Sequence, residues 1–253
     1  MENQAILTIR NLCKDYEIGT PVVKDLSFDV LQGEFLSILG SSGCGKTTLL
    51  RMLIGVLSPT AGSILKNGQD ITRTHASKRG MGIVFQNYAL FENMTVLRNV
   101  SYALKVRGMK DHNERALDML RRMGLEDLKD KKPASLSGGQ QQRVAIARTM
   151  VLQPDIILFD EPLSALDVST RLLMRKEIKA LQAESGVTMI YVTHDQEEAF
   201  AMSDRIMVMR NGCIEQLDTP DAIVDTPANE YVKQFVGDNL AMKLEALSRY
   251  GRG

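Results

Sequence analysis

A stretch of nine residues, Gly40–Thr48 with the sequence GSSGCGKTT, constrains the fold of this chain more than any other. It follows the apolar run Phe35–Leu39 and opens a segment with the apolar periodicity of a helix. A strand, a G-x-x-x-x-G-K-T loop and a helix in this order are typical of a phosphate-binding loop, because glycines let backbone N–H groups converge on an anion and the helix N-terminus adds its positive end. The stretch therefore predicts binding of a nucleoside triphosphate rather than an ordinary glycine-rich turn, with Lys46 on the β- and γ-phosphates and the Thr47 hydroxyl on Mg²⁺. The expected phosphate-binding residues are Gly40, Ser41, Ser42, Gly43, Cys44, Gly45, Lys46, Thr47 and Thr48.

Composition sets the class of protein around this loop. The chain has 253 residues, of which 44% are hydrophobic, so a large core can form. Lys plus Arg and Asp plus Glu both number 31, and this balance argues against nucleic acid as the main partner. No apolar run has the length of a membrane span, and no signal peptide is visible at the N-terminus. The three cysteines, Cys13, Cys44 and Cys213, lack metal-ligand spacing and suit a reducing, cytosolic compartment.

Alternating strand and helix patterns predict an α/β fold. Strand-like runs cover 5–10, 22–30, 81–85, 156–159 and 187–193, and Asn67-Gly68 and Asn211-Gly212 each predict a hairpin between two such runs. Apolar residues at helical spacing cover 95–108 and 113–124, with Thr95 as a cap for the first helix. We therefore expect a helical lobe of about residues 87–150 inserted into an α/β core, with an antiparallel β region near the N-terminus.

Polar residues follow three of the predicted buried strands. Gln86 follows the strand at 81–85, Asp160 and Glu161 follow the strand at 156–159, and His194 follows the strand at 187–193. Open α/β sheets bind ligands at the carboxyl ends of their strands. Two acids at such an end are costly unless a cation or a reaction uses them, which suits Asp160 to Mg²⁺ and Glu161 to orienting an attacking water; the alternative is a solvent-exposed strand end. His194 is well placed there to contact a γ-phosphate.

Two further features each allow two interpretations. Leu136–Gln140, with the sequence LSGGQ, precedes a helix that runs to about Leu152, and it reads either as a second phosphate cradle without a lysine or as a good cap on a flexible turn. Tyr16 either stacks on a nucleotide base or packs in the core. Met174, by contrast, has helical spacing with Ile178 and Leu181 and is predicted to be a core residue, in a helix that Gly186 ends.

Taken together, the motifs resemble those of ABC-transporter ATPase subunits, from Tyr16 to about Asn239. The motifs in matching order and spacing are Gly40–Thr48, Gln86, Leu136–Gln140, Ile156–Glu161, Ser164–Asp167 and His194. The segments Phe85–Phe91 and Thr193–Ala199 look like those of bacterial importers for polyamines, ferric iron, sugars or phosphonates. The resemblance implies the phosphate-loop fold of ABC ATPases, ATP and Mg²⁺ as cofactors, and ATP hydrolysis coupled to transport.

The resemblance also implies how the site is assembled. Two ATPase subunits, identical or paired, would form a head-to-tail dimer in which ATP on Gly40–Thr48 of one subunit is capped by Ser137, Gly138, Gly139 and Gln140 of the other. Tyr16 would stack on adenine, Gln86, Glu161 and His194 would be catalytic, and Thr47, Gln86 and Asp160 would hold Mg²⁺.

The partners follow from the same resemblance. A transmembrane permease would dock near Tyr88–Phe91, although Tyr88 and Phe91 equally suit the core. A solute-binding protein would act indirectly, no nucleic acid would be bound, and the chain would lie at the cytoplasmic face of the membrane. Polyamine and ferric iron are the leading solutes.

The chain also departs from the family in two places. We expect an ATPase domain at 1–240 and a short tail at 241–253, without the β-rich regulatory domain that importers of polyamines or sugars usually carry. Ser41 stands where many of these importers have proline, and we expect no effect because the loop binds through its backbone.

Other classes of protein explain the motifs less well. A soluble ABC ATPase acting on chromosomes would have a long coiled coil between Gln86 and Gly138, and one acting on ribosomes would have a duplicated cassette; neither feature is in the sequence. A small-molecule kinase would leave LSGGQ and His194 unexplained.

Overall fold

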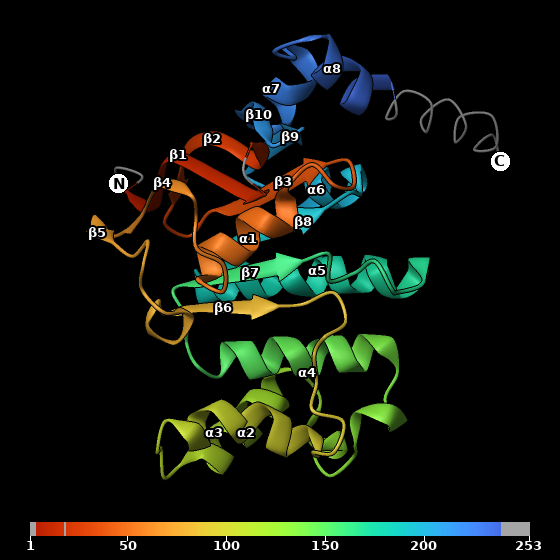
Figure 1. The fold of residues 1–253 in the computed structure, drawn as a ribbon. Helices are drawn as coiled ribbons and strands as arrows, with labels where there is room; N and C mark the ends of the chain where they lie inside the picture. The colour runs from red at the N-terminus through yellow and green to blue at the C-terminus, as the bar shows by residue number, and fades with distance from the viewer. Residues whose placement is uncertain (1–3, 18, 239–253) are drawn as a thin grey trace, which may run out of the picture. The chain divides into compact units, whose positions relative to one another are not determined.

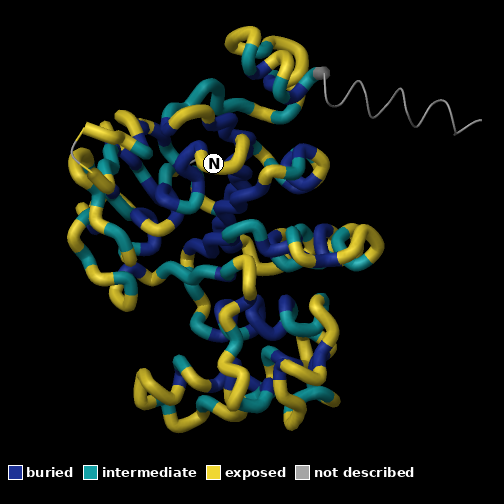
Figure 2. The backbone as a smooth tube through the Cα atoms, turned by 45° about the vertical axis from the view of Figure 1, so that its right-hand side comes forward, coloured by how far each residue is buried: buried dark blue, intermediate teal, exposed yellow. Residues whose placement is uncertain are grey.

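The computed structural model describes residues 4–17 and 19–238, and the chain divides into two compact units (Figure 1). The first unit is built from both ends of the sequence, residues 1–73 and 191–253, and the second is the continuous segment 74–190. The division falls inside strand β8 (Thr188–Thr193), all of whose residues are buried. Exposed residues, yellow in Figure 2, occur in the turns and also along the helices.

An antiparallel sheet of the first unit confirms the β region predicted near the N-terminus. Its strand order is β2-β1-β4-β5, and every adjacent pair is antiparallel. Asn67 (φ 49°) and Gly68 (φ 76°) both have positive φ between β4 and β5, as the predicted Asn-Gly hairpin turn requires. Strand β1 runs beyond the predicted end at residue 10 because Asn11 (φ 47°) lies in a register shift, which interrupts the apolar alternation without ending the strand. The bounds are β1 (Ala5–Glu17), β2 (Thr20–Leu31), β4 (Ala61–Lys66) and β5 (Gln69–Asp70).

The other strands of the first unit carry the phosphate loop. Strand β3 (Phe35–Gly40) is buried throughout and pairs in parallel with β9 (Arg205–Arg210), which forms the second predicted hairpin with β10 (Cys213–Asp218). The loop after β3 leads into helix α1 (Lys46–Ile54). The remaining elements of this unit are α6 (Gln196–Met202), α7 (Pro220–Asp225), α8 (Glu230–Val232) and the π-helical turn η4 (Lys233–Asp238). They pack on the strands through Leu39, Ala199, Ile206, Val208, Ile223, Val232 and Val236.

The second unit combines a pair of parallel strands with helices. Strands β6 (Met81–Val84) and β7 (Ile156–Asp160) pair in register, so the residues that follow them emerge at the same end. Residues 87–95 form turns rather than helix, since Tyr88 (φ 60°) and Ala89 (φ 47°) have left-handed backbone. Thr95 then caps the next helix by accepting a hydrogen bond from Arg98 N at 3.3 Å, as predicted. The helices are α2 (Val96–Val106), α3 (His112–Arg122), α4 (Gly138–Met150), α5 (Val168–Ser185) and the short turns η1 (Ala76–Lys78), η2 (Glu126–Leu128) and η3 (Pro133–Ser135).

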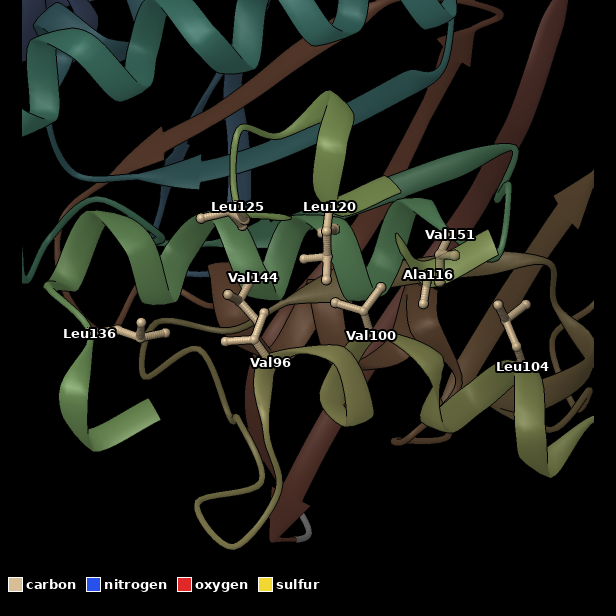
Figure 3. Close-up of a cluster of buried hydrophobic side chains, with 10 residues drawn as sticks. Val96, Val100, Leu104, Ala116, Leu120, Leu125, Leu136, Val144 and Val151 are labelled. Atoms are coloured by element: carbon tan, nitrogen blue, oxygen red, sulfur yellow. The ribbon is translucent and has the colours of Figure 1, made fainter. Parts of the chain in front are cut away.

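Helices α2, α3 and α4 share one apolar core (Figure 3). Val96 and Val100 of α2 are four residues apart, as are Ala116 and Leu120 of α3, so each pair faces the core from one side of its helix. Val144 of α4 completes the contact. Met174 of α5 is also buried, as predicted, and Gly186 (φ 64°) ends α5 in the left-handed conformation.

We predict that Leu120→Ala lowers the free energy of unfolding by about 2–5 kcal/mol, because the residue is fully buried and its removal leaves a cavity. Urea denaturation followed by circular dichroism measures the change. Val106→Ala is the control: this α2 residue is 70% exposed, and its truncation is expected to change stability by no more than about 0.5 kcal/mol. Equal effects of the two substitutions would contradict the assignment of the core.

Candidate nucleotide-binding site

The loop between β3 and α1 is closed by its own lysine. Lys46 is only 5% exposed, and its Nζ donates hydrogen bonds to the carbonyl oxygens of Gly40 (2.7 Å) and Ser41 (2.9 Å). Gly43 (φ 81°) and Gly45 (φ 105°) give the loop its curl. Gly45 is the N-cap of α1 and has no side chain with which to cap the helix. A buried ammonium beside an uncapped helix N-terminus fits a phosphate chain.

Glycine is required in this loop by close packing. A Cβ on Gly40 would lie 2.5 Å from the carbonyl oxygen of Met209 in β9, and one on Gly45 would lie 2.8 Å from the carbonyl oxygen of Val22 in β2. No larger residue fits either position without moving backbone. The loop is therefore shaped by neighbouring strands as well as by its own sequence.

The β9–β10 turn braces the loop from the side. Gly212 N donates to the carbonyl oxygen of Cys44 at 3.0 Å, and the Gly212 carbonyl accepts from Lys24 N at 2.9 Å. A Cβ on Gly212 (φ 84°) would lie 2.5 Å from the carbonyl oxygen of Val22. The sequence predicts a hairpin at this glycine but gives no sign that it contacts the phosphate loop, since the contact joins residues far apart in the chain.

Tyr16 lies beside the start of α1 and is not a core residue. Its ring is 56% exposed, which excludes the packing interpretation. The hydroxyl lies 3.3 Å from Oγ1 of Thr48, and Lys14 Nζ lies 5.8 Å from the ring centre. An exposed ring held next to the phosphate loop is suited to stacking on a base.

His194 follows β8 in the first unit and is exposed, with both flanks fixed. Asp195 caps α6 by accepting from Glu197 N at 2.8 Å. Glu198 is buried and accepts hydrogen bonds from the hydroxyls of Tyr191 (2.9 Å) and Thr193 (2.8 Å). No sequence pattern points to Glu198, whose two hydroxyl donors come from the strand before His194. The imidazole is thus presented from an anchored backbone.

In the second unit, Gln86 and Glu161 meet through a serine. Gln86 Nε2 lies 3.1 Å from Ser164 Oγ, which donates at 2.9 Å to the backbone carbonyl of Glu161. Asp160 and Glu161 are half-buried, so the alternative of an open, solvent-exposed strand end is wrong. Glu161 has φ 47°, a conformation that costs a glutamate about 1–3 kcal/mol and is typical of functional sites.

The LSGGQ segment caps helix α4 and places two closely packed glycines at the start of that helix. Ser137 Oγ accepts from Gln140 N at 3.3 Å while Gln140 Oε1 accepts from Ser137 N at 2.9 Å, a complete capping box on α4. A Cβ on Gly138 would lie 2.9 Å from Leu166, and one on Gly139 would lie 2.9 Å from Thr170. Both glycines are therefore needed where α4 meets the segment before α5 and the start of α5.

Tyr88 and Phe91, the two aromatic residues considered for partner docking, differ in their exposure. Tyr88 is 7% exposed, its hydroxyl is buried, and burial raises the pKa of that hydroxyl. Phe91 is 39% exposed, and its ring centre lies 4.9 Å from that of exposed Tyr102 on α2. Tyr88 is thus a core residue, whereas Phe91 belongs to an aromatic surface.

The predicted magnesium ligands each offer an oxygen of the kind that Mg²⁺ binds. Thr47 carries a hydroxyl, Gln86 an amide and Asp160 a half-buried carboxylate. Within residues 4–17 and 19–238, no group of three or more His, Cys, Asp or Glu side chains lies together as a metal site.

Comparison with known proteins identifies the family. Residues 23–164, more than half of the chain, match the profile described as ABC transporter, and the chain belongs to that family. It shares its fold with CbiO1 of Clostridium perfringens, part of the ABC transporter complex CbiONQ, at a TM-score of 0.81 and 30% identity over 98% of this chain and 99% of that one. This likeness confirms the predicted phosphate-loop α/β fold.

Two of the most similar curated relatives carry the same name. The spermidine/putrescine import ATP-binding protein PotA of Marinobacter nauticus is 49% identical over 93% of this chain and 63% of its own length. PotA of Haemophilus influenzae is 46% identical over 94% of this chain and 64% of its own length. The chain thus spans somewhat less than two thirds of these relatives. Among the described residues, no helix combines the length and the apolar character needed to cross a bilayer.

We predict that Gly212→Ala weakens ATP binding at least about tenfold, or 1.4 kcal/mol, because its Cβ meets the Val22 backbone and displaces the brace of the loop. Gly68→Ala is the matched control. Gly68 also follows an asparagine in a turn and has positive φ, so alanine costs about 1–2 kcal/mol of stability at either position. Nothing lies within 4 Å of a Cβ on Gly68, however. Titration with a fluorescent ATP analogue measures binding, and similar affinities for the two variants would exclude the bracing role.

Proposed function

We propose that this chain is the ATP-hydrolysing subunit of a bacterial ABC importer and that it acts as a head-to-tail pair. The proposal is carried by two helix N-termini that are flanked by glycines but differ in their phosphate-binding side chains. The start of α1 has an uncapped first turn and Lys46, whereas the start of α4 has Ser137 and two glycines but no lysine. The first can hold a triphosphate alone, and the second has only the means to cover one supplied by a partner subunit.

Each of the predicted site residues has a distinct role in this proposal. Lys46 gives up its carbonyl acceptors and binds phosphate oxygens, while Tyr16 stacks on adenine. Thr47, Gln86 and Asp160 would hold Mg²⁺, which would supply positive charge beside the phosphates. Glu161 accepts a proton from the attacking water as the water oxygen bonds to the γ-phosphorus, and the bond to the β-phosphate oxygen breaks with release of ADP. Gln86 and His194 orient the water and the γ-phosphate. Ser137, Gly138, Gly139 and Gln140 of the second subunit cover the γ-phosphate, so that hydrolysis releases the pair.

Transport requires partners that the surface can accommodate. We propose that a permease docks at the exposed aromatic pair Phe91–Tyr102, which places the subunit at the cytoplasmic face of the membrane, with a solute-binding protein acting indirectly. Polyamine is the proposed solute, supported by the names of the curated relatives. We keep residues 1–240 as the proposed ATPase domain, with the helical lobe at about 87–150; the proposed tail at 241–253 lies outside the described residues.

We predict that Glu161→Gln forms an ATP-bound dimer, because loss of the base stops hydrolysis and leaves both nucleotides in place. Size-exclusion chromatography with ATP and Mg²⁺ is expected to show a shift from one chain to two. The double variant Glu161→Gln/Ser137→Arg is the matched control, since the arginine obstructs the cover without touching the phosphate loop, and it is expected to stay monomeric. A monomer in the first case, or a dimer in the second, would overturn the sandwich.

A second experiment addresses the solute. We expect disruption of the gene to reduce uptake of labelled spermidine or putrescine by the parent cells while ferric iron uptake is unchanged, and the Glu161→Gln gene to fail to restore it. Loss of iron uptake alone would reassign the solute. Normal uptake of every solute, combined with active ATP hydrolysis, would favour a soluble ABC ATPase uncoupled from transport.

A further inference from the structure

The turn that leads from Gln86 to the exposed ring of Phe91 has a strained backbone. Tyr88 (φ 60°) and Ala89 (φ 47°) both lie in the left-handed region, which disfavours residues that carry a Cβ. Residues in this conformation persist only where the surrounding structure holds them there. The contacts that hold this turn come from helices α4 and α2.

Arg148, in the last turn of α4, binds both strained residues. Its two terminal nitrogens donate hydrogen bonds to the carbonyl oxygens of Tyr88 (2.8 Å) and Ala89 (2.6 Å). Hydrogen bonds from a charged donor are roughly twice as strong as neutral ones. The guanidinium carbon also lies 5.9 Å from the ring centre of Phe91, within reach of a cation–π interaction. One side chain therefore binds the two left-handed residues and lies near the aromatic ring.

Arg148 projects from a helix that is anchored on two sides. A Cβ on Gly82 of β6 would overlap Cγ2 of Thr149, the residue after Arg148, so the helix and the strand are in close contact. Val144 and Val151 of α4 are buried in the core shared with α2 and α3 (Figure 3). The guanidinium is thus supported by packing that does not depend on the turn.

The two ends of the turn have supports of their own. Asn99 of α2 is fully buried; it accepts a hydrogen bond from Phe91 N at 2.8 Å and donates one to the Phe91 carbonyl at 3.1 Å. At the other end, Gln86 Nε2 lies 3.1 Å from Ser164 Oγ. Asn99 and Ser164 hold the ends of the turn, and Arg148 holds its strained middle.

We propose that Arg148 is a positioning residue for the permease-docking surface. It holds Tyr88 and Ala89 in left-handed backbone, so that Phe91 is presented to the permease in one arrangement before docking. The inference rests on the proposed function, because it takes Phe91–Tyr102 as the docking surface. Gln86 keeps its own contact with Ser164 when Arg148 is replaced, so the loss of Arg148 uncouples transport from ATP hydrolysis without stopping hydrolysis.

The first test measures the turn in the isolated chain and needs neither permease nor solute. Amide hydrogen exchange is compared between the unaltered chain and Arg148→Met, which keeps a long side chain but removes its donors. The amides of Tyr88 and Phe91 are protected by hydrogen bonds to the Phe85 carbonyl (2.9 Å) and to Asn99 (2.8 Å). We expect both to exchange at least about tenfold faster in the variant, because two charge-assisted hydrogen bonds are lost, while the amides of α3 are unchanged.

Arg10→Met is the matched control for this comparison. Arg10 also donates a hydrogen bond to a backbone carbonyl, that of Ile9 at 2.8 Å, but it lies in the antiparallel sheet of the first unit. Its replacement is expected to leave exchange at Tyr88 and Phe91 unchanged.

The second test compares transport with hydrolysis. In parent cells whose own gene is disrupted, the Arg148→Met gene is expected to restore less than about a tenth of the labelled spermidine uptake that the unaltered gene restores, while the purified variant keeps kcat and KM for ATP within about twofold. Adding Ala89→Gly is expected to recover about half of the lost uptake, because glycine adopts left-handed backbone without a steric penalty and depends less on the arginine.

The outcomes separate the inference from the function on which it stands. Unchanged exchange at Tyr88 and Phe91, or faster exchange with unchanged uptake, would overturn it. A parallel loss of uptake and ATP hydrolysis, or no recovery with Ala89→Gly, would assign Arg148 a general structural role and would also overturn it. Failure of the unaltered gene to restore uptake would instead overturn the proposed function, and the exchange comparison would then decide by itself whether Arg148 holds the turn.

Discussion

The structure depends above all on a buried cation that is held by neutral partners. Lys46 lies at the base of the phosphate loop with two backbone carbonyls as acceptors. Carbonyls satisfy the hydrogen bonds of an ammonium but leave its charge uncompensated, and burying such a charge is expensive. The site thus has an intrinsic preference for an anion. Gly40 and Gly45, the Val22 backbone and the Gly212 turn hold that cation in a loop with no room for a side chain at either of the first two positions.

In the second unit, polar groups of the motifs form hydrogen bonds with one another. The Ser137 hydroxyl and the Gln140 amide satisfy each other across the start of α4, while Ser164 occupies both Gln86 and the Glu161 carbonyl. Glu161 is held in left-handed backbone by these contacts and not by its own preference. Ser137 and Ser164 thus order their motifs through hydrogen bonds within the chain.

Structural features that depend on neighbouring residues were predictable from the sequence. Both Asn-Gly hairpins, the Thr95 cap and the Gly186 helix end follow from residues within one turn of each other, and the structure confirms them. The motifs at the ends of β3, β6 and β7 were found in the same way. Contacts between distant segments were not predictable: those of Gly212 with Cys44 and with Lys24 have no joint signal in a single sequence. The bulge at Asn11 hid the true length of β1 because alternation fails there while pairing continues.

The division of the chain has a consequence for biosynthesis. Residues 74–190 form one uninterrupted unit, but the unit that contains the phosphate loop is assembled from both ends of the chain. A ribosome completes Gly40–Thr48 early, yet the strand and turn that brace it, β9 and Gly212, emerge more than 150 residues later. The nascent loop therefore lacks the contacts of β9 and Gly212 during most of translation, whereas the unit at 74–190 is continuous in the chain. A loop braced in this way requires that synthesis has passed Gly212.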